Sequence, residues 1–114
     1  TNMEHSKPKA VVVTGASAGV GRATVREFAK KGAHIGLLAR GIDGLEAAKK
    51  EVELLGGRAL ILVTDVSDAN QVEEAAAKVE KEFGPIHIWV NNAMVSVFSP
   101  IKEMMPEEFK RVTD

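Results

Sequence analysis

The 114 residues of this chain include no cysteine, no tyrosine and only one tryptophan. Without cysteine there is no disulfide framework and no thiolate ligand for a metal ion. Without tyrosine, no proton transfer within these residues can use a phenol group. An excess of charge is also missing, because 15 Lys and Arg stand against 16 Asp and Glu for a net charge of −1. Such a chain lacks the basic field that holds nucleic acid or an anionic membrane surface.

Long apolar runs are missing as well. No stretch approaches the roughly 20 residues that cross a bilayer, and the polar residues 1–9 are not a signal peptide. Residues 1–8 are expected to form a disordered or tag-derived tail. A cytoplasmic location is compatible with these features and is the expected one. The composition, 45% hydrophobic and 27% charged, is typical of one globular domain or a piece of one.

A glycine-rich turn follows the first apolar segment. Residues 10–13 are small and mostly β-branched, which predicts a strand buried on both faces, as in a parallel sheet covered by helices. Gly15 then permits a tight turn, Gly19 lets the backbone approach a phosphate, and Gly21 allows a new helix to lie close against the strand. The start of that helix would present free N–H groups to a pyrophosphate. A glycine-rich turn alone would be a solvated loop, but between a strand and a helix it predicts dinucleotide binding.

Strand and helix patterns alternate along the rest of the chain, which predicts an α/β protein with a parallel sheet and right-handed crossovers. Further strands are expected at 33–39, 59–64 and 86–90, with helices between them. The expected helix stops are Gly32, Gly56 and Gly84. Ser67 or Asp68 is expected to cap the third helix with Gln71 as the partner in a capping box, and a last helix is expected to open at Pro106.

Three motifs occur in order: Thr14-Gly15-(x)3-Gly19-x-Gly21, Asp65-Val66 and Asn91-Asn92-Ala93. Together they resemble the short-chain dehydrogenase/reductase family of the classical type, and the resemblance covers residues 9–114. It implies a Rossmann-like, doubly wound parallel sheet that is incomplete here, with the strand order 3-2-1-4 and flanking helices. Residues 9–114 would then be the N-terminal, cofactor-binding part of a single, truncated Rossmann domain.

The resemblance also implies a nicotinamide dinucleotide as cofactor. The residues expected to bind it are Gly15, Ser17, Ala18, Gly19, Val20, Gly21, Arg40, Asp65, Val66, Asn92, Ala93 and Met94. Arg40 stands where an acidic residue would bind the 2′-hydroxyl of NAD, and its guanidinium suits the 2′-phosphate of NADP instead. NADP is therefore the predicted cofactor. NAD stays open, because Ala18 provides no second basic residue in the loop and Arg40 can also be read as merely solvated.

Two of these positions have alternative interpretations. By the resemblance, Asp65 accepts a hydrogen bond from the adenine amino group and Val66 lends its backbone and an apolar wall. The alternative for Asp65 is that it only supports the turn that follows. Met94 stands where the family has glycine, and it either narrows the cofactor groove or fills the core. His5, His34 and His87 are not spaced as metal ligands, so no metal site is predicted.

The family transfers a hydride between the nicotinamide and an alcohol or carbonyl carbon of a small-molecule substrate. A tyrosine, helped by a lysine four residues later and by a serine, handles the proton. Because the chain has no tyrosine, no catalytic residue is predicted within it. The predicted function is the NADP(H)-binding portion of such an oxidoreductase, which at full length is expected to form a homo-oligomer. The alternative is a stand-alone, non-catalytic module for dinucleotide binding or protein interaction.

Overall fold

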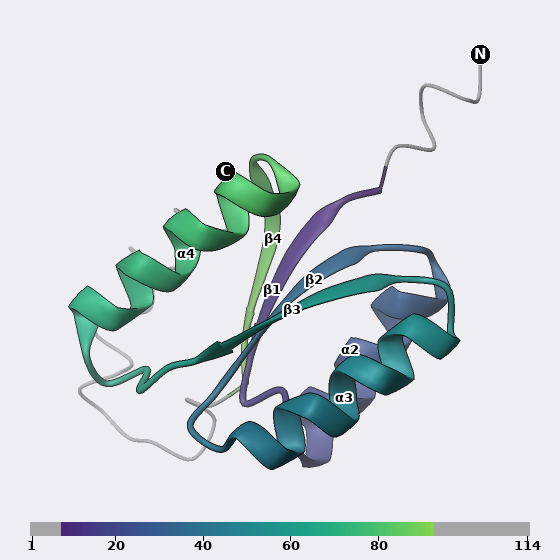
Figure 1. The fold of residues 1–114 in the computed structure, drawn as a ribbon, viewed down its shortest axis with the longest axis horizontal. Helices are drawn as coiled ribbons and strands as arrows, with labels where there is room; N and C mark the ends of the chain where they lie inside the picture. The colour runs from purple at the N-terminus through teal and green to yellow at the C-terminus, as the bar shows by residue number, and fades with distance from the viewer. Residues whose placement is uncertain (1–7, 93–114) are drawn as a thin grey trace.

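The computed structural model describes residues 8–92 (Figure 1). Strands and helices alternate in this part of the chain. The elements are β1 (Ala10–Thr14), α2 (Gly19–Lys30), β2 (His34–Ala39), α3 (Ile42–Leu54), β3 (Arg58–Val63), α4 (Ala69–Phe83) and β4 (Ile86–Asn91). Each predicted strand boundary differs from the observed one by a single residue at most. The expected helix at Pro106, nearly all of the expected tail, and the predicted site residues Ala93 and Met94 lie outside the described residues.

The strands are parallel and lie in the order β3-β2-β1-β4. This confirms the Rossmann-like topology that the sequence predicts. β1 lies between β2 and β4, and all five of its residues are buried. The run of small β-branched residues therefore forms a central strand with covered faces, as parallel sheets require.

The helices cover both faces of the sheet. α2 and α3 lie side by side on one face, and α4 lies on the other (Figure 1). Along β1, Val11 and Val13 pack into the cluster that contains Val25 of α2, whereas Val12 packs with Val79 of α4. The period of two along the strand thus divides the core into two layers.

Glycines end α2 and α3 in the same way. Gly32 has a φ of 80°, and its N–H donates to the Ala29 carbonyl at 2.9 Å while the Ala33 N–H donates to the Phe28 carbonyl at 3.2 Å. This pair of bonds is a Schellman motif, which satisfies the last carbonyl groups of the helix. Gly56 repeats the arrangement after α3 with a φ of 103°. Both predicted stops are confirmed, and each turn directs the chain into the next strand.

Asp68 caps α4, as predicted. Its Oδ1 accepts hydrogen bonds from the N–H groups of Asn70 at 3.0 Å and Gln71 at 3.3 Å. The Gln71 side chain does not complete the expected capping box, because the Asp68 N–H already donates to the Asp65 carbonyl at 2.9 Å. Gln71 Oε1 instead accepts from the Asp65 N–H at 2.8 Å. The start of α4 is therefore tied to the turn that follows β3.

Aromatic and charged side chains contact one another at the end of the sheet where β2 and β3 begin. The rings of His34 and Phe83 have centroids 5.0 Å apart, and the Arg58 guanidinium lies 5.5 Å from the centroid of the same phenyl ring. Glu82 forms an ion pair with Arg58 at 3.5 Å. Burial, and then the charge of Arg58, lower the pKa of His34 below its usual value of 6.5.

We expect the stability of the fold to fall in mild acid because of His34. The unfolded chain takes up a proton at this histidine near pH 6.5, whereas the folded chain does so only at lower pH. Its contribution is therefore complete above about pH 6.5 and is lost as the pH falls through the lowered pKa. Urea unfolding at about pH 7.5 and about pH 5.5 measures the difference. The His34→Gln variant should show a smaller pH dependence, and an unchanged dependence would contradict the assignment.

Candidate functional site

The glycine-rich loop joins β1 to α2 at the carboxyl edge of the sheet. Gly15 and Gly19 have positive φ values of 62° and 58°, a region that favours glycine. Ala18 is the N-cap of α2, no side chain caps this helix, and its first turn has no acidic residue. α4 differs, because the Asp68 side chain accepts from two of its first N–H groups. The first amides of α2 are thus left for an external acceptor, which an anion provides.

Gly21 and Gly19 have different surroundings. A Cβ at Gly21 would overlap the carbonyl oxygen of Gly15 and stand 2.7 Å from the carbonyl carbon. This is the close packing that the sequence predicts for the third glycine. A Cβ at Gly19 would meet nothing within 4 Å, so the space beside the start of α2 is open. Open space, a positive φ and an uncapped helix together fit the pyrophosphate of a dinucleotide.

Hydrogen bonds hold the loop to both neighbours of β1. The Ala16 N–H donates to the Leu38 carbonyl of β2 at 3.2 Å, and the Thr14 hydroxyl lies 3.1 Å from Oδ1 of Asn91 at the end of β4. The chain leaves β1 toward β2 and later returns as β4 on the other side of β1. The loop therefore lies where the strand order reverses, which is the usual ligand position in open α/β sheets.

Arg40 and Asp65 follow neighbouring strands at this same edge. β2 and β3 pair as far as Ala39 and Val63, and the Thr64 N–H donates to the Ala39 carbonyl at 2.8 Å. Arg40 is exposed just beyond this pairing, while Asp65 is half-buried. The parallel register thus brings a guanidinium and a carboxylate near one another beside the glycine-rich loop.

Asp65 also supports the turn after β3. Its Oδ1 accepts from the N–H of Ser67 at 3.0 Å and from the hydroxyl of Ser67 at 2.7 Å. These hydrogen bonds, and to a smaller extent the charge of Arg40, lower the pKa of Asp65. The turn role that the sequence left open is therefore present. Both bonds use one oxygen, so the second carboxylate oxygen can still accept from a ligand.

The remaining predicted residues lie along the same edge. Ser17 and Val66 are half-buried, whereas Ala18 and Val20 are exposed, Val20 to 70%. Asn92 directly follows β4, and its buried Nδ2 has no hydrogen-bond partner within residues 8–92. A buried amide without a partner is uncommon in native proteins, and a bound ligand is one way to satisfy it.

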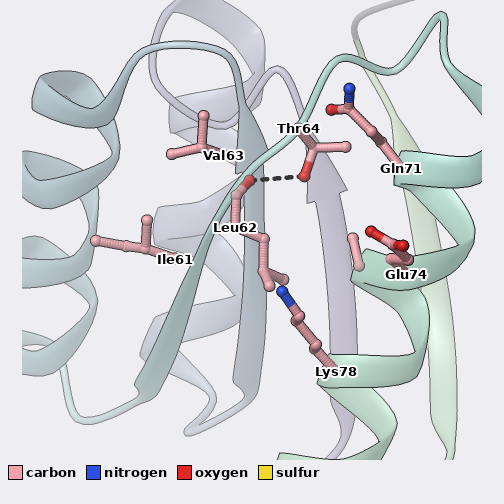
Figure 2. A pocket seen from close by; sticks show the side chains of 8 residues that line it. Ile61, Leu62, Val63, Thr64, Gln71, Glu74 and Lys78 are labelled. Atoms are coloured by element: carbon pink, nitrogen blue, oxygen red, sulfur yellow. Dashed lines mark hydrogen bonds between the residues drawn. The ribbon is translucent and has the colours of Figure 1, made fainter.

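A groove of about 380 Å³ lies near this edge, between β3 and α4 (Figure 2). Figure 2 shows Gln71, Glu74 and Lys78 projecting from α4 toward β3, and the Thr64 hydroxyl donates to the Leu62 carbonyl at 2.8 Å. None of the predicted cofactor-binding residues lines the groove. It lies on the α4 face of the sheet, opposite α2 and α3, and the sequence gives no signal for it.

Sequence reasoning did not identify the contacts that α3 makes with the loop. Gly44 of α3 lies against Ser17, and Glu51 of α3 accepts a hydrogen bond from Arg22 at 2.8 Å. In the sequence, Arg22 and Glu51 have the pattern of ordinary solvated helix charges. No local signal distinguishes them, because the contact depends on how two helices lie on the sheet.

Residues 8–92 contain neither a membrane-spanning helix nor a cluster of metal ligands. No helix there is both long and apolar enough to cross a membrane. No group of three or more His, Asp or Glu side chains gathers there as metal ligands.

Known proteins are similar to this chain in sequence and in fold. A family model described as short chain dehydrogenase matches residues 9–114. YxnA, an uncharacterized oxidoreductase of Bacillus subtilis, is 35% identical over 112 residues, which are 98% of this chain and 32% of YxnA. L-Sorbose reductase from Gluconobacter frateurii, solved with NADPH and L-sorbose, matches with a TM-score of 0.72 and 35% identity over 83% of this chain and 39% of its own. A structure from Haemophilus influenza with bound NAD, assigned as a D-mannonate oxidoreductase, has a TM-score of 0.66 and 26% identity over 71% of this chain and 29% of its own. The chain thus spans roughly a third of the length of these proteins.

We expect the Gly19→Val variant to lose dinucleotide binding while the sheet stays folded. Valine at a φ of 58° adds backbone strain of about 1–3 kcal/mol and fills the open space beside the loop. Calorimetric titration with NADPH, beside circular dichroism, measures binding and folding.

Gly32→Val is the matched control for this prediction. Gly32 has a φ of 80° and open space around it, but it lies at the other end of α2. The control should show similar strain and normal binding. Retained binding in Gly19→Val would show that the loop is only a turn. An equal loss in both variants would show that backbone strain, and not the filled space beside the loop, removes binding.

Proposed function

Since this chain belongs to the short chain dehydrogenase family, we propose that it is the NADP(H)-binding portion of an oxidoreductase. The enzyme transfers a hydride between the nicotinamide and an alcohol or carbonyl carbon of a small-molecule substrate. The observation that carries the proposal is the uncapped start of α2: Gly15 before it and Gly19 as its first residue have positive φ, and the space beside Gly19 is open.

The chain's own residues bind and orient the cofactor. The amides of Gly19, Val20 and Gly21 donate to the pyrophosphate, because no side chain of the loop competes for them. Gly15 and Ser17 shape the turn that brings these amides together, and the absence of a Cβ at Gly19 gives the phosphate access. When bound, the nicotinamide supplies the hydride chemistry.

The adenosine half lies along the ends of β2, β3 and β4. The exposed guanidinium of Arg40 pairs with the 2′-phosphate, and the second oxygen of Asp65 accepts from the adenine amino group. Val66 forms an apolar wall, and Asn92, Ala93 and Met94 complete the binding segment after β4. The NADPH complex of L-sorbose reductase supports this choice of cofactor. NAD remains the alternative, since the Haemophilus relative holds NAD.

We expect the full-length protein to bind NADPH more tightly than NADH, and Arg40→Asp to remove or reverse this preference. A charge-assisted bond to phosphate contributes about 1.5–3 kcal/mol, which corresponds to about tenfold or more in affinity. Lys50→Asp makes the same charge change at an exposed position of α3 and should leave the preference unchanged. Calorimetric titration with both nucleotides measures the ratio. Equal affinities in the unmutated protein would contradict the assignment of Arg40.

The proton-transfer residues of the enzyme are proposed to lie outside this chain. The chain has no tyrosine, and it spans about a third of its relatives. The whole protein would then contain a tyrosine with a lysine four residues later, would work in the cytoplasm and would form a homo-oligomer. A reading frame that continues beyond Asp114 into such a segment supports this proposal. A reading frame that ends without one supports the stand-alone module.

Residues 1–114 expressed alone are expected to reduce no carbonyl substrate and to aggregate or pack loosely. Among the described strands β4 pairs only with β1, and Trp89 and Val90 in it are just half-buried. An apolar strand with an open edge promotes pairing between molecules. An NADPH-oxidation assay, light scattering and near-UV circular dichroism of Trp89 test these expectations. A monomeric fragment that unfolds cooperatively would contradict them and support the stand-alone module.

A further inference from the structure

We propose that α3 positions the phosphate-binding loop through Gly44 and Glu51, and that these two residues tune dinucleotide affinity without touching the ligand. This inference rests on the function proposed above. Both residues lie on α3, outside the motifs that the family resemblance assigns. Both contacts converge on Ser17, the residue just before the N-cap of α2.

The first contact is steric. A Cβ at Gly44 would lie 2.6 Å from the Cβ of Ser17 and 3.5 Å from the Ser17 carbonyl oxygen. Two carbon atoms do not approach this closely without a bond. The Ser17 Cβ is attached directly to the backbone and cannot rotate away. A side chain at position 44 must therefore displace the loop or α3.

The second contact is a charged hydrogen-bond bridge. Arg22, in the first turns of α2, donates from Nε to Oε1 of Glu51 at 2.8 Å and from Nη1 to the Ser17 carbonyl at 3.4 Å. Because the guanidinium is planar and rigid, the carboxylate of Glu51 fixes the orientation in which it reaches Ser17. Arg26 adds two longer bonds to the same carboxylate, both at 3.4 Å. α3 thus supports Ser17 at two points. Gly44 lies against the Ser17 side chain, and Glu51 acts through Arg22 on the Ser17 carbonyl.

A shift of Ser17 would displace the backbone N–H groups that are proposed to bind the cofactor. Ala18 follows Ser17 as the N-cap, and Gly19 and Val20 are the first residues of the helix. Their N–H groups bind the pyrophosphate only if they converge on it, because binding sites depend on geometry held to about half an ångström. Gly44 and Glu51 are therefore positioning residues.

The direction in which NADPH affinity changes when Glu51 is replaced distinguishes an effect of its charge from positioning of the loop. The hydrogen bond from Arg22, with the charges of Arg22 and Arg26, lowers the pKa of Glu51, so the carboxylate is ionised. A negative charge near the loop repels phosphate. If Glu51 acted only through its charge, its removal would strengthen NADPH binding. If it positions the loop, its removal weakens binding.

The first experiment is calorimetric titration of the Gly44→Ala variant of the full-length protein with NADPH, with urea unfolding beside it. We expect roughly tenfold weaker binding, with stability changed little because alanine favours the helix. Gly41→Ala is the matched control, since a Cβ there meets nothing within 4 Å. It should bind within about twofold of the unmutated protein. Normal binding by Gly44→Ala, or an equal loss in the control, would overturn the proposal.

The second experiment uses Glu51→Met, which keeps the side-chain length and removes both oxygens. Its control is Glu46→Met, the loss of an exposed carboxylate on the same helix. We expect about fivefold weaker NADPH binding for Glu51→Met and unchanged or slightly tighter binding for the control. Unchanged or tighter binding by Glu51→Met would overturn the positioning role.

Amide hydrogen exchange without ligand separates this inference from the proposed function. In Glu51→Met, the amides of residues 16–20 should exchange faster than in the unmutated protein and in Glu46→Met. If the unmutated protein does not bind NADPH, the proposed function fails, yet faster exchange in Glu51→Met still supports positioning by α3. Unchanged exchange in Glu51→Met would overturn it whatever the protein binds.

Discussion

Within residues 8–92, the first backbone N–H groups of α2 have no capping side chain, and contacts with β2, β4 and α3 hold the loop that places them. A helix start of this kind is stabilised when an anion accepts its hydrogen bonds. The chain has other means of capping a helix, as Asp68 shows at the start of α4. At Ala18 it uses none, and the first turn contains no acidic residue that would compete with a phosphate. α3 also starts without a side-chain cap, at Gly41, but its first turn contains the acidic Asp43. Among the three described helices, only α2 combines an uncapped start with a first turn free of acidic residues.

Several separate contacts keep the open position rigid. β1 is buried along its whole length, so it provides a fixed starting point. Ala16 is bonded to β2, and Thr14 lies in hydrogen-bond distance of Asn91 on β4. Gly21 packs α2 against the turn, and α3 supports Ser17 from outside. Because the strand order reverses at β1, the ends of β2, β3 and β4 face the same region, and each contributes one or more of the proposed site residues.

The sequence predicted the sheet well because its signals are local. The β-branched run of β1, the glycine stops after α2 and α3, and the Asp68 cap each act within a few residues of themselves. Strand order came from the family resemblance. The contacts between α3 and Ser17 could not be predicted, since they depend on where two helices cross and since Glu51 looks like any exposed helix charge. The hydrogen bond of the Gln71 side chain with the N–H of Asp65, in place of the expected one with the N–H of Asp68, likewise depends on the three-dimensional turn. The sequence also could not decide between the two roles of Asp65, because a carboxylate can support a turn and can equally bind a ligand.

Binding of the cofactor at the start of α2 is tested most directly by a map of the backbone amides that change when NADPH is added to the full-length protein, by NMR or hydrogen exchange. We expect the changes to concentrate in residues 15–22, with further changes at Arg40 and Asp65. The groove between β3 and α4 in Figure 2 should change little around Glu74 and Lys78. Changes confined to that groove, with the first amides of α2 unaffected, would contradict the claim that the uncapped helix start binds the cofactor.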